Sequence, residues 1–317
     1  MKQFIFKFSL FIAIFVFGLS AFSAFLKFGQ KNHDSKSEFK LKLLLEEKTI
    51  DPEIIIFGSS VAEGALNPGI ISRLVGKATF NAALSGRRII DWSPVAFSFL
   101  DYTKNNQVII LDIFPNVFNE TDNLYQPHEF YPYLNNKFVK EALAPISITY
   151  DKMTSLPFYY LTQLNSKIVL NSLAGVRDVV FHNPSKIPLD YKGFNKINSE
   201  YEEGQLTNLI QPEISTRSKR LYEQLFLQAA NKDIKVILVG MPVYVNGQKY
   251  YHNLDFVYHW GKVWDSEYEN VSFINFINDT TIINNQDFFA NNTHLNKLGS
   301  SFLSKNIGNY LTQSSND

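Results

Sequence analysis

The stretch Glu53-Ile54-Ile55-Ile56-Phe57-Gly58-Ser59-Ser60 decides the fold. Its apolar run is short, continuous and β-branched, which is typical of a strand buried on both faces of a sheet. Gly58 and the serines after it favour a sharp turn into a helix. A serine hydroxyl at such a turn is a candidate nucleophile, although Gly-Ser-Ser after a strand is more often a turn or a helix cap.

Comparable strands and helices alternate along much of the chain. The sequence predicts further strands over 78–82, 107–112, 235–240 and 271–276, and helices over 68–75, 92–102, 216–231, 254–267 and 297–311. This alternation predicts an α/β fold built on a three-layer, doubly wound parallel sheet. Ligands of such sheets bind beyond the carboxyl ends of the strands, and Ser60 follows one of those ends.

The alternation stops between residues 116 and 212, a segment rich in aromatic residues, Asn and Pro. It has only a moderate helical pattern over 159–174. The segment is too long for an ordinary loop, and we interpret it as an aromatic-rich insertion that contributes to the substrate site. Four of its aromatic residues could stack on sugar rings or simply pack in a core: Tyr125, Phe130, Tyr131 and Tyr133.

The N-terminus predicts export. Lys2 and Lys7 precede an uncharged run over 8–26, whose 19 residues would span about 29 Å as a helix, close to one hydrocarbon core. A cleaved signal peptide could end among the small residues at 20–24, whereas the length and the bulky Phe residues favour an uncleaved anchor over cleavage or a buried core helix. We therefore expect an anchor or signal over 1–28, a polar stalk over 29–50 and a folded domain over 51–317.

The composition argues against several classes of function, namely nucleic-acid binding, cysteine chemistry and metal binding. Lys+Arg and Asp+Glu both number 30, which argues against a nucleic-acid partner. The chain has no cysteine, which excludes disulfides, thiolate catalysis and cysteine-ligated metals. The spacing of His252 and His259 does not make a convincing zinc site, so we predict neither a metal nor a cofactor.

A second candidate element lies near the C-terminus, in Asn291-Asn292-Thr293-His294-Leu295-Asn296-Lys297-Leu298-Gly299. It places His294 in a loop just before the last predicted helix. A lone histidine is more often structural, but an imidazole here could serve as the base that a serine nucleophile needs.

Taken together, three blocks resemble the SGNH/GDSL hydrolase family: Gly58-Ser59-Ser60-Val61 after the first strand, Asn81–Gly86 after the second, and Asn291-x-x-His294 followed by Leu295-Asn296-x-x-Gly299. The resemblance covers about 53–112 and 235–311. It implies a flavodoxin-like sheet order. Within the family, the chain resembles membrane-anchored proteins of polysaccharide and teichoic-acid acylation.

The resemblance also implies roles for individual residues. Ser60 would attack an ester carbonyl, His294 would take its proton, and the backbone N–H groups of Ser60 and Gly86 would bind the oxyanion. Two positions depart from the family pattern. The aspartate expected three residues before the histidine is Asn291, with Asp287 as a possible substitute, and the third block is absent, leaving Asn116 as a possible oxyanion donor.

Two functions follow from this sequence. The first is a serine acyl-ester hydrolase or O-acyltransferase that acts on a carbohydrate or acylated polymer of the cell envelope. The second is a catalytically silent module that binds glycan or supports a membrane-bound acyltransferase. In either case we expect a bacterial envelope protein, anchored in the inner membrane and facing the periplasm or exterior, or else secreted.

Overall fold

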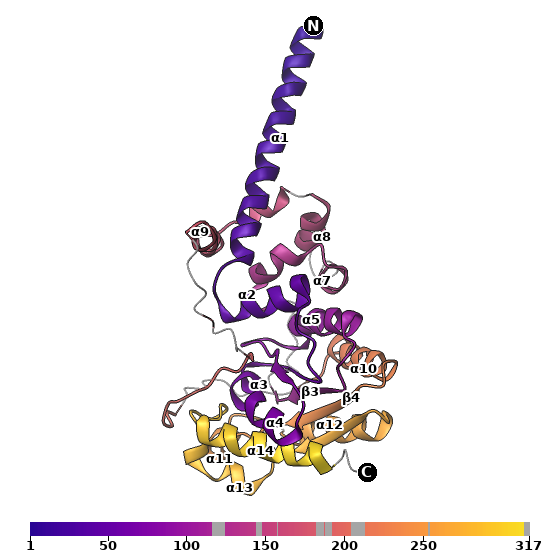
Figure 1. The fold of residues 1–317 in the computed structure, drawn as a ribbon, viewed down its shortest axis with the longest axis vertical. Helices are drawn as coiled ribbons and strands as arrows, with labels where there is room; N and C mark the ends of the chain where they lie inside the picture. The colour runs from indigo at the N-terminus through magenta and orange to yellow at the C-terminus, as the bar shows by residue number, and fades with distance from the viewer. Residues whose placement is uncertain are drawn as a thin grey trace. The chain divides into compact units, whose positions relative to one another are not determined.

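The computed structural model describes residues 1–115, 124–143, 148–156, 158–181, 187, 192–203, 213–252 and 254–313. Its elements form two compact units (Figure 1). The N-terminal unit comprises Met1–Glu47 and Gln126–Leu189, and the sheet unit comprises Lys48–Tyr125 and Asp190–Asp317.

The sheet unit contains a five-stranded, wholly parallel sheet in the order β2-β1-β3-β4-β5. The strands are β1 (Ile54–Phe57), β2 (Thr79–Asn81), β3 (Val108–Ile113), β4 (Lys235–Gly240) and β5 (Val271–Asn275). Ile54 lies opposite Thr79 on one side and Val108 on the other. This is the flavodoxin-like order, and it confirms the predicted fold class. The order changes direction between β1 and β3, where such sheets place their ligands.

Helices cover the sheet in two groups. The elements are α3 (Ser60–Ala65), α4 (Pro68–Val75), α5 (Ile89–Tyr102), α10 (Thr216–Ala230), α11 (Val245–Gln248), α12 (Asp255–Glu267), α13 (Thr280–Ile283), η5 (Gln286–Phe288) and α14 (Lys297–Gln313). An aromatic core joins α5, α10 and α12 through Trp92, Tyr222 and Trp264. In the second group, Ser304 of α14 links α3 to the start of α4, because its hydroxyl donates to Ala65 O at 3.2 Å and accepts from Asn67 N–H, at the N-cap of α4, at 2.8 Å.

The N-terminal unit is helical. Its elements are α1 (Lys2–Lys31), α2 (Lys36–Leu41), η1 (Lys42–Glu47), η2 (Pro127–Tyr133), α7 (Lys137–Leu143), α8 (Ile148–Ser155), η4 (Tyr159–Gln163) and α9 (Ser166–Val180). Leu41, Leu44 and Phe130 are fully buried in this unit. The Gln30 side chain is buried as well, with its amide oxygen accepting from Tyr160 Oη at 2.9 Å.

These units divide the chain differently from the ranges that the sequence suggested. Residues 36–47 are helical and contribute buried leucines, so they form part of a core rather than a polar stalk. The described residues between 126 and 187 belong to the same unit, in which Phe130, Tyr131 and Tyr133 are buried. Residues 192–203, also within the predicted insertion, belong to the sheet unit.

Helix α1 changes character along its length. Among the described residues it is the one helix long and apolar enough to cross a membrane. Its large apolar side chains are exposed through most of residues 4–17, whereas Ser23, Leu26 and Gly29 are buried. A core helix of a soluble protein would be buried along its apolar run, so the exposed part is compatible with a signal anchor or a signal peptide.

Candidate active site

Ser60 and His294 meet at the carboxyl edge of the sheet. The Ser60 hydroxyl lies 3.0 Å from Nε2 of His294, although 234 positions separate the two residues. Ser60 is the first residue of α3, directly after β1, and His294 lies in the loop between η5 and α14. The distance allows direct proton transfer from the hydroxyl to the imidazole.

Asn291 holds the other side of the imidazole. Its amide oxygen lies 3.1 Å from Nδ1 of His294 and also accepts the backbone N–H groups of Thr293 and His294, at 3.0 and 2.9 Å. The Thr293 hydroxyl lies 3.1 Å from Nδ1. An acceptor at this position favours the tautomer with hydrogen on Nδ1, which leaves Nε2 free to accept from Ser60.

Asp287 occupies a different place. It belongs to η5, where its backbone N–H donates to Asn285 Oδ1 at 3.1 Å and its carbonyl accepts from Asn296 at 2.8 Å. Within the described part of the chain, its carboxylate is not among the hydrogen-bond partners of His294. The geometry therefore gives the orienting position to Asn291.

The surroundings of His294 disfavour its charged form. Burial lowers the pKa of its imidazole below the ordinary value of 6.5. No carboxylate lies within hydrogen-bonding distance to oppose this effect in the described residues, because the partner of Nδ1 is the neutral Asn291. The histidine is consequently a weaker base than an exposed imidazole and is mainly neutral at pH 7.

The turn before Ser60 rests on Asp112, at the end of β3. Both carboxylate oxygens accept the Ser59 backbone N–H, at 3.2 and 3.1 Å, and Oδ2 also accepts the Ser59 hydroxyl at 2.5 Å. Gly58 has φ +149°, and a Cβ there would lie 2.1 Å from Asp112 Oδ1, so this position requires glycine. Burial raises the pKa of Asp112 to about 6.

Sequence reasoning did not identify Asp112 as part of the site. The signal was present, because a carboxylate ends the apolar run Val108-Ile109-Ile110-Leu111. Parallel strands bring their carboxyl ends to one edge, so an acidic residue at the end of β3 must lie close to the turn that follows β1.

The loop after β2 is tied to the same turn. Ala82 N–H donates to Ile56 O at 2.7 Å, and Leu84 N–H donates to Gly58 O at 3.0 Å. Gly86 follows with φ +72°, and a Cβ there would lie 2.5 Å from the Tyr125 ring. Gly86 is exposed, and the role of its backbone N–H as an oxyanion donor stays a prediction. Asn116, the other possible donor, lies outside the described residues.

Residues 192–203 form a strap that touches the end of β2, α3 and the loop that carries His294. At its start, Lys192 O accepts from Asn81 N–H at 2.8 Å, and a Cβ on Gly193 would lie 1.7 Å from Asn81 O. In its middle, Asn195 N–H donates to Glu63 O on α3 at 3.1 Å. The strap therefore links the loop after β2 to the helix that begins with Ser60.

The far end of the strap joins the loop that carries His294. Glu202 N–H donates to Ala290 O at 3.0 Å, and the Tyr201 hydroxyl donates to Asn292 Oδ1 at 2.6 Å. Asn292 is buried, and its carbonyl accepts from Tyr244 N–H at 3.0 Å. The strap thus fixes the side chain of Asn292, which lies next to the candidate residue Asn291 in the sequence.

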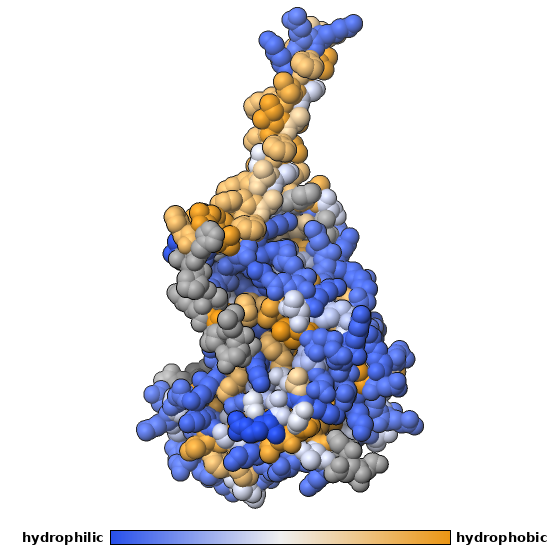
Figure 2. Space-filling view, in the orientation of Figure 1, coloured by the Kyte–Doolittle hydropathy of each residue, from blue (hydrophilic) through white to orange (hydrophobic). Residues whose placement is uncertain are grey.

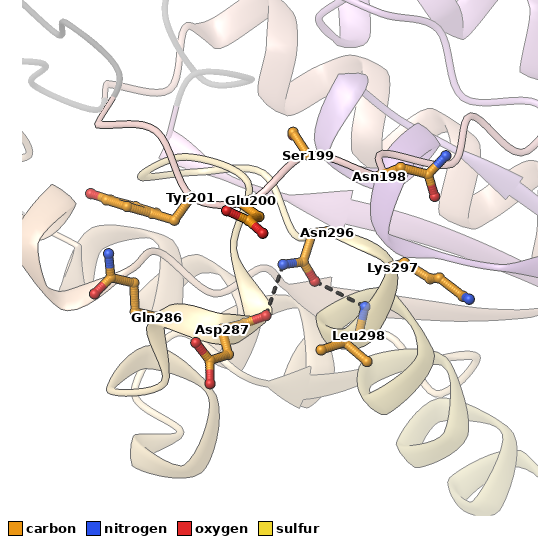
Figure 3. A pocket seen from close by; sticks show the side chains of 9 residues that line it. All are labelled: Asn198, Ser199, Glu200, Tyr201, Gln286, Asp287, Asn296, Lys297 and Leu298. Atoms are coloured by element: carbon orange, nitrogen blue, oxygen red, sulfur yellow. Dashed lines mark hydrogen bonds between the residues drawn. The ribbon is translucent and has the colours of Figure 1, made fainter.

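An open pocket of about 580 Å³ lies between the strap and this loop (Figure 3). Its lining is formed by Asn198, Ser199, Glu200, Tyr201, Gln286, Asp287, Asn296, Lys297 and Leu298. Amide, hydroxyl and carboxylate groups predominate, accompanied by one aromatic ring and one ammonium. This set of groups suits a ligand that presents many hydroxyls.

The described residues contain no group of three or more His, Asp and Glu side chains arranged to hold a metal ion. The chemistry available at this edge of the sheet is that of a serine, an imidazole and an amide. Fold and site together define a doubly wound α/β protein with a serine–histidine pair beyond its switch point.

Comparison with protein-family models found no match, and comparison with curated proteins found none either. Solved structures with some similarity include a proposed platelet activating factor from Streptococcus pneumonia, at 15% identity and TM-score 0.41, covering 89% of this chain and 93% of that one. Another is a proposed acylhydrolase from Bacteroides fragilis, at 9% identity and TM-score 0.42, covering 88% and 97%.

Proposed function

We propose that this protein is a membrane-anchored serine acyl-ester hydrolase or O-acyltransferase that acts on a carbohydrate of the bacterial cell envelope. The observation that carries the proposal is the hydrogen-bonded series Ser60–His294–Asn291, with distances of 3.0 and 3.1 Å. Each member has the partner that its role in acyl transfer requires.

The reaction follows from this series. The Ser60 oxygen bonds to the acyl carbon while its proton moves to Nε2 of His294, and the same proton then goes to the departing alcohol. The acyl group stays on Ser60 as an ester. Water or a sugar hydroxyl next gives its proton to His294 and attacks that ester. His294 returns the proton to the departing Ser60 oxygen, which restores the serine hydroxyl and yields an acid or a new ester.

The pocket beside the strap supports a carbohydrate as substrate. Sugars are recognised by hydrogen bonds from amides and carboxylates to hydroxyl groups and by contact of an aromatic ring with a sugar face. Tyr201, Asn198 and Glu200 provide these groups from the strap, and Gln286 and Asp287 provide more from η5. A membrane-bound acyltransferase is a suitable source of the acyl group.

The structure of α1 supports an anchor that stays attached. Cleavage among residues 20–24 would cut the helix beside Ser23, Leu26 and Gly29, which are buried in the N-terminal unit. The exposed apolar run on their N-terminal side then serves to span the inner membrane, with the sheet unit in the periplasm or exterior. A secreted form would keep Leu26 and Gly29, and its new N-terminus would lie within the helix beside this packing.

A silent glycan-binding module is the second candidate, and Asn291 favours it. A neutral amide orients His294 but does not stabilise the imidazolium, and the equivalent Asp-to-Asn change in a serine protease lowers kcat by about 10⁴. A module of this kind would use the pocket without turning over an ester and would support a membrane acyltransferase complex.

Ester turnover by the full-length protein in detergent micelles separates the two candidates. We expect hydrolysis of a chromogenic acetyl ester that Ser60→Ala abolishes and Ser301→Ala, on the exposed face of α14, leaves unchanged. The outcome that contradicts the enzyme is equal turnover by wild type and Ser60→Ala, together with full rescue of a deletion strain by Ser60→Ala.

A further inference from the structure

Helix α9 carries an apolar face on its outside. Ile168, Ser172 and Gly175 are buried against the N-terminal unit. The large apolar side chains on the outside of the helix and just beyond it are Leu170, 64% exposed, Leu173, 49%, Val180, 59%, and Phe181, 72%. At about 100° per residue these lie away from the buried stripe, where a helix in water presents polar groups.

The helix crosses α1 at the end of the apolar run of α1. A Cβ on Gly29 would lie 2.0 Å from Ser172 O, and a Cβ on Gly175 would lie 1.9 Å from Gly29 O. The two backbones are therefore in direct contact. Gly29 lies three residues beyond Leu26, or about 4–5 Å further along the helix, which is where a helix spanning residues 8–26 would emerge from the hydrocarbon.

Polar contacts fix how α9 is turned. Lys167 Nζ donates to Gln126 Oε1 at 3.2 Å, and Asn171 Nδ2 donates to Glu38 Oε1 at 3.5 Å. These side chains tie one flank of α9 to its own unit, so the apolar side faces away from that flank. Figure 1 shows α9 nearly end-on while α1 runs up the picture, so α9 runs across α1 rather than along it.

We infer that α9 lies on the bilayer surface, with Leu170, Leu173 and Val180 in the boundary between headgroups and acyl chains. The inference rests on the proposed anchoring of the chain by α1. A lipid surface is the occupant because the apolar surface of α1 continues onto α9, as Figure 2 shows. Amphipathic helices of this kind settle about 5–10 Å into that boundary.

Side chains at the end of α1 fit the same level of the membrane. Lys27 Nζ lies 5.3 Å from the ring centre of Tyr160, and Lys31 Nζ lies 5.4 Å from that of Tyr133. The two rings are buried in the N-terminal unit, whereas the lysines are partly exposed, and lysine side chains near the end of a spanning helix extend to the membrane–water interface. Arg177, on the outer side of α9, has a long side chain that can reach phosphate groups while its carbons stay with the acyl chains.

The cysteine-free sequence permits a direct test on the full chain. Single cysteines replace Leu170 or Leu173, carry a spin label, and are placed in nanodiscs of phosphatidylethanolamine and phosphatidylglycerol. We expect collisions with oxygen, which dissolves in lipid, to exceed collisions with a water-soluble nickel chelate several-fold. Leu227→Cys, at an equally exposed leucine of α10, is the matched control and should show the opposite preference.

A label at Phe15→Cys, within the exposed run of α1, separates the two proposals. If this label lies in lipid while the α9 labels respond like Leu227→Cys, the inference about α9 is wrong, the anchor stands, and a protein partner becomes the occupant of the face. If the Phe15→Cys label itself is aqueous, the anchor is wrong and the inference falls with it.

Discussion

The carboxylate of Asp112 holds Ser59 by both its backbone N–H and its hydroxyl, at 3.1 and 2.5 Å. Ser59 is also the residue whose hydroxyl caps α3 by accepting from Val61 N–H at 3.2 Å. One buried acid at the end of β3 therefore sets the position of the helix that starts with Ser60. This arrangement costs stability, because the acid is removed from water and has no cation beside it among the described contacts.

We expect Asp112→Asn to stabilise the protein at neutral pH. Burial raises the pKa of Asp112 from 3.8 to about 6, so between these values the native state holds a proton that the unfolded state has released. Native stability accordingly falls as the pH rises through this window, by on the order of 2–3 kcal/mol. Asparagine does not titrate and escapes this loss.

The measurement is denaturant unfolding of both proteins at pH 4 and pH 7. The difference in unfolding free energy, variant minus wild type, should increase toward pH 7 by about 2 kcal/mol. Comparing the two proteins cancels contributions from other titrating groups. A difference that is the same at both pH values would show that the Asp112 carboxyl does not titrate in this range.

Asn291→Asp should raise ester turnover. A carboxylate at this position can accept the same N–H groups from Thr293 and His294 and can also stabilise the imidazolium that forms during the reaction. We expect kcat to increase by roughly tenfold or more, measured with a chromogenic ester. Asp287→Asn, at a carboxylate that does not contact His294, should leave kcat nearly unchanged. Loss of turnover in Asp287→Asn would transfer the orienting role to that residue.

The acid limb of the pH profile should lie below pH 6.5 in the wild-type protein. Burial lowers the pKa of His294, and only the neutral imidazole can take the proton of Ser60, so the limb lies at lower pH than an exposed histidine would give. In Asn291→Asp the new charge favours the imidazolium, and the limb should move to higher pH. The profile of kcat/KM from pH 4 to pH 8 tests both statements, and coincident limbs would contradict them.

Gly193→Ala should loosen the strap. The glycine has φ +80°, and an added Cβ would meet Asn81 O at 1.7 Å. Gly76→Ala is the matched control, because Gly76 has φ +72° but open space around it. Backbone strain alone costs about 1–2 kcal/mol, so the free energy of unfolding of Gly76→Ala should fall by that amount. The free energy of unfolding of Gly193→Ala should fall further, because its Cβ also collides with Asn81 O. Thermal unfolding measures the loss, and equal melting temperatures would show that the strap yields without cost.

Local patterns were sufficient to predict the sheet. The strand over 235–240 and the helix over 68–75 have the predicted bounds, because an apolar run or an Asn67-Pro68 start defines them without help from distant residues. The helix predicted over 159–174 was less well placed. Asn165 caps a new helix by accepting from Ile168 N–H at 3.0 Å, so the chain forms η4 and then α9.

Long-range contacts were harder to predict. Ser60, His294 and Asn291 were identified from their motifs, and the structure brings them together. The sequence did not distinguish the strap from the rest of the predicted insertion, because residues 192–203 show no helical or strand-like pattern of apolar residues. Backbone hydrogen bonds to Asn81, Glu63 and Ala290 hold the strap in place, and these partners lie far away in the sequence.

The separation of Ser60 and His294 along the chain has a consequence for folding. A contact between residues 234 positions apart requires closure of a long loop, which makes it slow to form compared with contacts inside one helix or hairpin. Until then the serine has no base beside it and is an ordinary alcohol. A chain that is still being synthesised therefore has Ser60 without His294 beside it, and the pair exists only in the folded protein.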